Sequence, residues 1–257
     1  MPSSAAARPT SLDRFQIQEA RYAFPYHYIP HFDAPGRPSV LRTLSWGLEY
    51  LCYMHHIKQL VDSLAPASVL EVGCGDGRFI GLLGTVARRV GVDLAPRAIQ
   101  FARVFNPDVE FFAEDAADLG ETFDAVMAIE VLEHVPDEGI GQFLRTLAAR
   151  TKDGGHVVIC VPTTVTPVIP KHYRHYELSL FQQQLESSGA PLNIVQVDYV
   201  FRKTPALKLY LRLMHNAWWS FELRGVQHAV WRYIWNRLRV AQEGNGRHLV
   251  LVLEKQP

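Results

Sequence analysis

The chain of 257 residues is predicted to form a doubly wound α/β fold, in which helices cover both faces of a parallel sheet. Three observations support this prediction. From residue 67 onward, short apolar runs alternate with segments of helical periodicity, a pattern typical of parallel sheets buried on both faces. The first run ends in a glycine-rich turn, and the second ends in a carboxylate. Right-handed crossovers between parallel strands would then place helices on both sides of the sheet.

Residues 1–64 are expected to form a cover segment followed by a helix. The first twenty residues are small and polar, and residues 22–38 combine four prolines with five aromatic residues. Prolines at this density prevent a continuous helix, so we expect the aromatic segment to lie extended over the domain. Leucines recur at helical spacing in residues 39–64, and Pro66 follows the end of this pattern as expected just beyond a helix.

Residues 65–257 are expected to form one domain. The predicted strands are Ser68–Val72, Val90–Asp93, Val109–Ala113, Ala125–Ile129, His156–Val161, Asn193–Phe201 and His248–Glu254. The predicted helices lie near residues 77–87, 95–105, 137–150 and 176–188, and a helical insertion is expected at 203–240. Short strands separated by helical segments of this length are typical of βαβ units.

The charge balance excludes a protein whose whole surface binds nucleic acid. Lys+Arg and Asp+Glu both number 26, so the formal net charge is zero, whereas phosphate binding needs a basic excess. The charges are unevenly distributed, because residues 203–240 hold seven Lys or Arg and one acid, a net charge of +6. The rest of the chain therefore carries −6. A local contact with an anionic partner remains compatible with this pattern.

The cysteines and the apolar pattern favour a cytoplasmic location. Cys52, Cys74 and Cys160 form no CxxC pair, so neither a disulfide framework nor a structural zinc site is expected. The N-terminus has no apolar signal region of the kind that directs secretion. No apolar run is long enough to suggest a membrane-spanning helix, which needs about twenty residues.

A glycine loop follows the first predicted strand, in the sequence Glu71-Val-Gly73-Cys74-Gly75-Asp-Gly. Glycines at alternate positions let the backbone approach a ligand closely and adopt positive φ angles. A dinucleotide site would need the pattern GxGxxG, but Arg78 occupies its third glycine position. The loop is therefore GxGxG, which disfavours a nicotinamide-dependent oxidoreductase.

Two acidic positions follow the next two strands. Asp93 precedes Leu94 and comes eighteen residues after Gly75. It can accept hydrogen bonds from both ribose hydroxyls of a nucleoside, and it can also cap the next helix. Asp115, in Glu114-Asp115-Ala116, can accept a hydrogen bond from an adenine amino group or stabilise a surface turn.

These segments together resemble the class I S-adenosylmethionine-dependent methyltransferases. The matching strings are Glu71-Val-Gly-Cys-Gly-Asp-Gly, Val90-Gly-Val-Asp93, Glu114-Asp115-Ala116 and Phe123-Asp-Ala-Val-Met-Ala-Ile-Glu130-Val-Leu-Glu133-His134-Val-Pro136. The last string resembles the branch that includes the ubiquinone-pathway O-methyltransferase. The resemblance covers residues 64–189 and the last predicted strand. It implies a Rossmann-like seven-stranded sheet whose last strand is antiparallel, with the helical insertion before that strand.

The resemblance also implies S-adenosylmethionine as the cofactor. Its methionine end would contact the glycine loop and the end of the fourth strand. The cofactor-binding residues that we expect are Glu71, Gly73, Cys74, Gly75, Asp93, Leu94, Asp115, Ala116, Ile129 and Glu130.

His134 is the candidate catalytic residue, as a general base toward the methyl acceptor. It follows the fourth strand, at the sheet edge where open α/β folds bind ligands, but it could instead only order its loop. A divalent metal held by Glu130, Glu133 and His134 with His172 or His175 is an alternative; we predict no metal. Further candidates for the acceptor site are Tyr26, His27, Tyr28 and His31.

The insertion at 203–240 contains four of the five tryptophans. An apolar stripe at helical spacing runs through Val230, Trp231, Ile234, Trp235 and Leu238. Three interpretations are open: a lid packed on the core, a membrane-surface patch, and an acceptor pocket in which arginines pair with an anion.

The sequence thus predicts a cytoplasmic S-adenosylmethionine-dependent methyltransferase that acts on an oxygen of a small-molecule or lipid-linked acceptor. Residues 203–240 are a candidate for peripheral contact with a membrane. Two alternatives are a non-catalytic or membrane-docking module on the same fold and a nucleotide-cofactor oxidoreductase.

Overall fold

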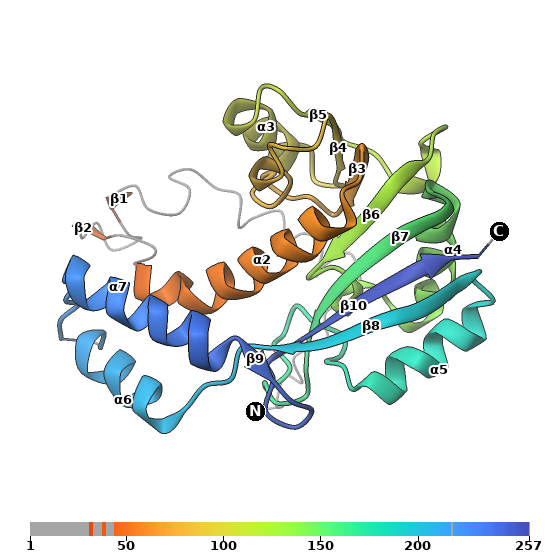
Figure 1. Cartoon of the computed structure of the whole chain (residues 1–257). Helices are drawn as coiled ribbons and strands as arrows, with labels where there is room; N and C mark the ends of the chain where they lie inside the picture. The colour runs from red at the N-terminus through yellow and green to blue at the C-terminus, as the bar shows by residue number, and fades with distance from the viewer. Residues whose placement is uncertain (1–30, 33–37, 40–43, 217, 257) are drawn as a thin grey trace, which may run out of the picture.

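The computed structural model describes residues 31–32, 38–39, 44–216 and 218–256. Within them, one mixed sheet has the strand order β5-β4-β3-β6-β7-β10-β8-β9 (Figure 1). Its strands are β3 (Ser68–Val72), β4 (Arg88–Val92), β5 (Glu110–Phe112), β6 (Phe123–Ile129), β7 (Thr151–Pro162), β8 (Leu192–Val200), β9 (Val240–Ala241) and β10 (His248–Lys255). Strands β3 to β7 pair in parallel, and β10 lies antiparallel between β7 and β8. The short strands β1 (His31–Phe32) and β2 (Pro38–Ser39) form a separate antiparallel pair.

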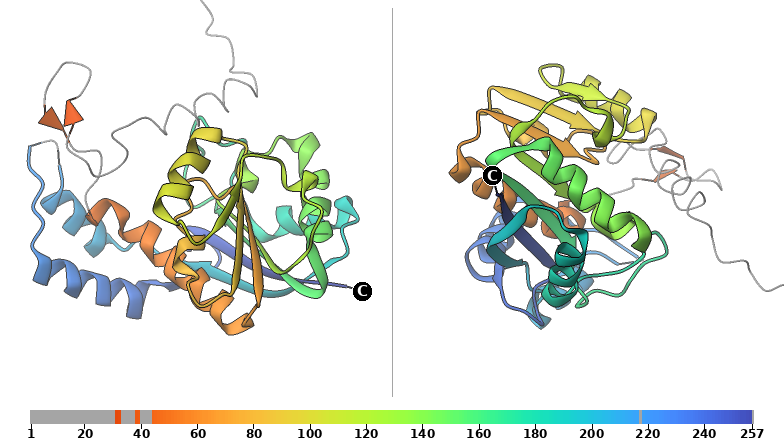
Figure 2. Two further views of the ribbon diagram at one scale, coloured as in Figure 1. Left: turned by 90° about the horizontal axis from the view of Figure 1, so that it is seen from above. Right: turned by 90° about the vertical axis from the view of Figure 1, so that its right-hand side faces the viewer.

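Helices cover both faces of the sheet, as the alternating pattern predicts. The helices are α2 (Leu44–Leu64), α3 (Pro96–Phe105), α4 (Ile140–Arg150), α5 (Leu178–Ser188), α6 (Pro205–Met214) and α7 (Arg224–Tyr233). Ile57 of α2 and Ile99 of α3 are buried in the core on one face. Leu144 of α4 and Phe181 of α5 are buried in the core on the other face. Figure 2 shows the resulting three layers.

All seven predicted strands form, and β10 is antiparallel as predicted, but the sheet has eight strands rather than seven. The eighth, β9, pairs Val240 and Ala241 with Val200 and Tyr199 at the outer edge of β8. A two-residue strand is too short to produce a recognisable alternation of apolar and polar residues. The carboxyl edge of β3, β4 and β6, where the site is expected, is unaffected.

The helix expected near residues 77–87 is wrong, because only the 3₁₀ helix Ile80–Leu82 forms there. Gly81 and Gly84 lower the helix propensity of this segment. The side chain of Asn106, at the end of α3, lies against Gly81 at a position that a Cβ atom would occupy. Its amide nitrogen donates to the carbonyl oxygen of Gly77 at 3.2 Å. The segment therefore turns around Asn106 and does not continue as an α-helix.

The insertion at 203–240 forms a helical arm of α6, α7 and the π-helical turn Ile234–Leu238. Both ends of that turn are buried, and Trp231 and Trp235 pack against the core that contains α2. The apolar stripe of the arm thus faces the protein. Among the described residues, none of the helices is both long and apolar enough to cross a membrane.

The expected cover segment lies outside the described residues, as do Tyr26, His27 and Tyr28. His31 is described only through the backbone of β1. The helix predicted for residues 39–64 is described from Leu44 as α2.

Candidate active site

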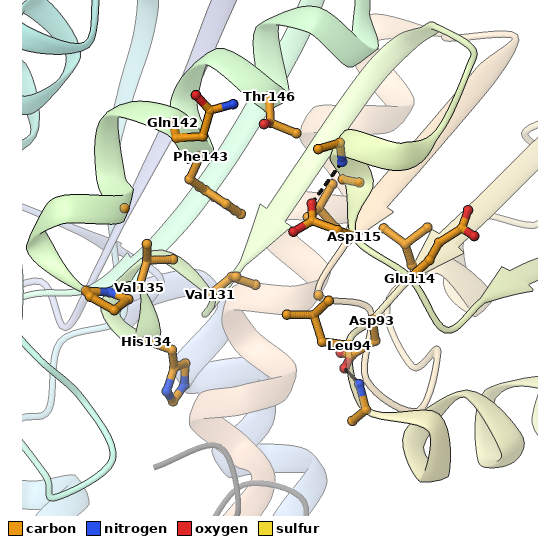
Figure 3. Close-up of a pocket in the computed structure, with 18 of the residues that line it drawn as sticks. Asp93, Leu94, Glu114, Asp115, Val131, His134, Val135, Gln142, Phe143 and Thr146 are labelled. Carbon is orange, nitrogen blue, oxygen red and sulfur yellow. Dashed lines mark hydrogen bonds between the residues drawn. The ribbon is translucent and has the colours of Figure 1, made fainter. Parts of the chain in front are cut away.

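A cavity of about 490 Å³ opens at the carboxyl ends of β3, β4 and β6. Figure 3 shows Asp93, Leu94, Glu114 and Asp115 on one side of it and His134 with Val135 on the other. Phe143 and Gln142 of α4 contribute a further wall. The volume lies within the range of about 300–1,000 Å³ that is typical of pockets for small molecules and cofactors.

The glycine loop forms the cavity's edge at the end of β3. Gly73, Gly75 and Gly77 all have positive φ angles, which is the conformation that favours glycine. A Cβ atom on Gly73 would lie 2.5 Å from Cγ2 of Val131, which follows β6. At Gly73 the loop therefore presents backbone without a side chain to the cavity.

Glu71 connects β3 to the segment that follows the glycine loop. Its carboxylate accepts a hydrogen bond from the backbone N–H of Ile80 at 3.0 Å, and burial raises its pKa well above the usual value. Burial also raises the pKa of the Cys74 thiol, so this cysteine is a small buried residue and not a reactive thiolate. Glu71, Cys74 and Gly75 do not line the cavity, and neither does Ile129.

Asp93 connects the glycine loop to the start of α3. One carboxylate oxygen accepts from the backbone N–H of Gly75 at 2.8 Å, and the other accepts from that of Ala95 at 2.8 Å. Each carboxylate oxygen can accept two hydrogen bonds. Both interpretations of Asp93 therefore remain compatible, because it fixes the local backbone and also lines the cavity.

Asp115 lies farther along the same edge, after β5. Its carboxylate accepts from the backbone N–H of Ala117 at 2.9 Å, the bond drawn as a dashed line in Figure 3. Asp115 and Ala116 both line the cavity, as do Gly73, Asp93, Leu94, Glu130 and His134. Seven of the eleven residues predicted for cofactor binding and catalysis therefore converge on one cavity.

Glu130 follows β6 directly and has a left-handed backbone conformation, with φ of +56°. A non-glycine residue there costs free energy unless its surroundings fix it. Its carboxylate forms a hydrogen bond with Nδ1 of His248 at 3.0 Å, and Nε2 of the same ring forms one with the carboxylate of Glu49 at 3.2 Å. Arg247 donates to Glu49 at 2.6 Å. Alternating charges, of which only His248 is buried, therefore link α2, β10 and the segment after β6.

These charged side chains shift the pKa values of His248 and Glu49. Burial alone would lower the pKa of His248, but Glu130 and Glu49 outweigh it and raise the pKa to about 9. Burial alone would raise the pKa of Glu49, but His248 and Arg247 lower it to about 2. His248 is thus an imidazolium at neutral pH. Reasoning from the sequence missed His248 and Glu49, because no local pattern marks them.

His134 faces the cavity from the 3₁₀ helix Leu132–His134. Its Nδ1 lies 3.0 Å from the carbonyl oxygen of Lys171. A carbonyl oxygen only accepts hydrogen bonds, so Nδ1 carries the hydrogen and Nε2 carries the lone pair in the neutral ring. This tautomer is the one that a general base acting through Nε2 requires.

Glu133 lies next to His134, and its side chain is fully buried. Neither carboxylate oxygen has a hydrogen-bond partner among the described residues, and Nε2 of His134 is 3.8 Å away. Burial and the neighbouring Glu130 raise the pKa of Glu133 well above its usual value. Glu133 therefore holds a proton far more readily than an exposed glutamate.

The residues of the metal alternative separate into two groups. Ligand atoms of Glu133, His134 and His172 lie within 4.8 Å of one another, while Glu130 groups with Cys160 and His248. His175 does not face the first group directly, because its Nε2 is bonded to Nδ1 of His172 at 2.8 Å. The geometry could accommodate a cation at the first group, next to the cavity.

Residues 48–232 match the family model described as a methyltransferase domain. The chain is 29% identical over 173 residues to a ubiquinone biosynthesis O-methyltransferase of Azorhizobium caulinodans, covering 62% of this chain and 64% of that protein. It is 33% identical over 114 residues to the protein of the same name from Alkalilimnicola ehrlichii, covering 41% of this chain and 45% of the relative. These matches span only about half to two thirds of the relatives' length.

Solved structures have the same fold at lower identity. The N-methyltransferase NodS of Bradyrhizobium japonicum, crystallised with S-adenosyl-L-homocysteine, is 15% identical with a TM-score of 0.57, over 95% of this chain and 99% of that one. The magnesium protoporphyrin IX methyltransferase of Synechocystis with the same ligand is 13% identical with a TM-score of 0.57, over 97% and 95%.

Proposed function

The chain belongs to the S-adenosylmethionine-dependent methyltransferases, and from this premise we propose that it transfers a methyl group to an oxygen of a small-molecule or lipid-linked acceptor. The observation that carries the proposal is the single cavity that Gly73, Asp93, Asp115, Glu130 and His134 line together. Acidic acceptors for a nucleoside and a candidate base for the methyl acceptor thus lie at one sheet edge.

The volume and the lining residues of the cavity suit the cofactor. Its volume of about 490 Å³ suits a ligand of nucleoside size with an amino acid tail. Asp93 would accept hydrogen bonds from the ribose hydroxyls, and Asp115 would accept one from the adenine amino group. Gly73 and Glu130, which line the same cavity, would contact the methionine end.

When bound, S-adenosylmethionine supplies a methyl group already activated by a positively charged sulfur. The chain's own residues then need to align the acceptor, exclude water and remove a proton. Val131, Val135 and Phe143 give the cavity apolar walls that exclude water. His134 would take the hydroxyl proton through Nε2 as the oxygen–carbon bond forms and the sulfur–carbon bond breaks, while Lys171 fixes its ring through Nδ1.

Calorimetry tests the cofactor half of the proposal. The protein should bind S-adenosylhomocysteine and show no binding of NADH. Asp93→Ala should weaken S-adenosylhomocysteine binding at least tenfold, because about 1.4 kcal/mol of lost hydrogen bonding suffices for this change. Asp118→Ala, which removes an exposed carboxylate nearby, is the matched control. Binding of NADH without S-adenosylhomocysteine would instead identify an oxidoreductase.

Methyl transfer itself is measured with labelled S-adenosylmethionine and a panel of phenols, catechols and lipid extracts. We expect His134→Ala to lose turnover and to keep S-adenosylhomocysteine binding. If His134→Ala turned over normally, the base role would be wrong. Failure of the wild type to methylate any acceptor, with intact cofactor binding, would favour the non-catalytic alternative.

A lipid-linked acceptor and a cytoplasmic position at a membrane surface belong to the same proposal. They are supported by the basic composition of residues 203–240 and by the exposure of aromatic side chains in the arm. A small soluble acceptor would use the same cavity and would not need the arm.

A further inference from the structure

Exposed apolar side chains gather where α6 leads into α7. Trp218 is 88% exposed, and the others are between about half and three fifths exposed. We call this group the arm tip; its members are Leu209, Leu213, Trp218, Trp219, Phe221 and Leu223. Side chains of this size in contact with water are a mark of an interaction surface when they are grouped.

The arm tip is held in place by backbone contacts. The N–H of Phe221 donates to the carbonyl oxygen of Met214 at 2.8 Å, and His215 and Ser220 form an antiparallel bridge. The indole N–H of Trp219 donates to the carbonyl oxygen of Leu213 at 2.8 Å. Because these contacts already fix the backbone, docking would need to order the side chains alone.

The side chains that attach the arm to the core are not those of the arm tip. The arm attaches to the protein through Trp231, Trp235, Ile234 and Leu238, which contact the core with α2. The rings of Trp231 and Trp235 stack at 5.9 Å between centroids. Figure 2 shows α6 and α7 extending beyond the sheet beside the N-terminal half of α2. The segment between α6 and α7 therefore lies at the end of the arm that extends away from the sheet (Figures 1 and 2).

Exposed cations lie on both helices of the arm. Lys208 and Arg212 of α6 and Arg224 and Arg232 of α7 are all exposed. Glu222 is the one acid among residues 203–240, which carry a net charge of +6. The rest of the chain carries −6, so the arm is electrostatically distinct from the domain that holds the cavity. Tryptophan and leucine beside arginine and lysine suit the headgroup region of a bilayer with anionic lipids.

We propose that the arm tip inserts Trp218 and its neighbours into the headgroup region of an anionic phospholipid bilayer. The charge of the arm selects this partner over a neutral membrane, and the aromatic side chains select it over a soluble anion. The contact does not depend on methyl transfer. If the acceptor is lipid-linked, the contact would bring the cavity to the surface where such acceptors reside.

Vesicle flotation of the full chain tests the proposal. We expect the protein to float with phosphatidylcholine vesicles containing phosphatidylglycerol, and at least tenfold less with phosphatidylcholine alone. High salt should reduce flotation, because exposed charges are screened. Failure of the wild type to float with the anionic vesicles would overturn the proposal.

Two variants separate the contributions of the arm tip. Trp218→Ser with Phe221→Ser removes apolar area, and Arg212→Glu with Arg224→Glu reverses charge; each should reduce flotation at least tenfold. The matched control is Phe105→Ser, which removes an exposed aromatic side chain at the end of α3. Every variant should retain the wild-type melting temperature and S-adenosylhomocysteine affinity, so a loss of flotation is not a loss of fold or of cofactor binding.

Sedimentation velocity without lipid tests whether a second copy of the chain, and not a bilayer, covers the arm tip. The wild type should be monomeric at the concentration used for flotation. A dimer that the Trp218→Ser and Phe221→Ser variant dissociates would show that a second copy covers the arm tip, and it would overturn the proposal. Equal flotation of wild type and both arm-tip variants would also overturn it.

Discussion

Replacing His248 by glutamine should remove the positive charge that lies between Glu49 and Glu130. Burial alone lowers the pKa of His248, but the two carboxylates raise it to about 9 from a usual value of 6.5. At about 1.4 kcal/mol for each pH unit, the charged ring contributes about 3 kcal/mol to the free energy of unfolding. His248 is nearly fully buried, so solvent screening reduces this figure little.

The sign of the pH dependence follows from linkage. The pKa of His248 is higher in the folded than in the unfolded chain, so the stabilisation is complete below about pH 6.5. It decreases as the pH rises and is lost above about pH 9. The pKa of Glu49 is lowered to about 2, whereas burial raises the pKa values of Tyr53 and Cys160. Groups that do not contact His248 titrate alike in both proteins and cancel in the difference.

Urea unfolding of the wild type and His248→Gln from pH 6 to pH 10 measures this contribution. The stability difference should be about 3 kcal/mol at pH 6 and should shrink toward zero near pH 10. His228→Gln, at an exposed position on α7, should show no such dependence. A difference that stays constant from pH 6 to pH 10 would refute the charged bridge.

Three further predictions concern the cavity and the residues beside it. Gly73→Ala should cost about 2–3 kcal/mol of stability and weaken S-adenosylhomocysteine binding, because the Cβ meets Val131. Gly154→Ala, which has the same φ of +73° and open space around it, should cost only about 1 kcal/mol; equal losses in urea unfolding would exclude the clash. Glu133→Gln should be more stable than the wild type at pH 8, because an acid with a raised pKa destabilises the fold as the pH rises above 4.5. This gain should vanish at pH 4, and a loss at pH 8 would mean that a partner holds the carboxylate. Removal of divalent metals with EDTA should leave turnover unchanged if His134 acts as the base; a loss restored by adding a divalent metal would assign Glu133, His134 and His172 to metal binding.

The parts of the fold that local sequence determines were predictable. Strands β3, β4 and β6 are short apolar runs because both faces of the sheet are buried, and this composition is readable without a partner. Gly73 and Asp93 follow strand ends, so their meeting at one edge follows from the parallel direction of the strands. The cavity they line was therefore within reach of the sequence.

Contacts between distant segments were not predictable in the same way. His248 meets Glu49 across 199 positions and Glu130 across 118, so no spacing rule connects them. The failed helix after Gly77 depends on Asn106, a residue of another element. The stripe with Trp231 and Trp235 was recognised, but whether it faced α2 or a membrane depended on how the arm folds back.

The place of β10 in the sheet makes synthesis of residues 248–255 a condition for a finished site. β10 follows β7 and β8 in the sequence, yet it pairs between them. β10 can pair with β7 and β8 only after residues 248–255 have left the ribosome, and such late, long-range pairing is slow. Until then Glu130 has no imidazolium beside it. During synthesis the glycine loop and Asp93 would therefore be present before His248. The strand order delays the contact of His248 with Glu130 until β10 has paired.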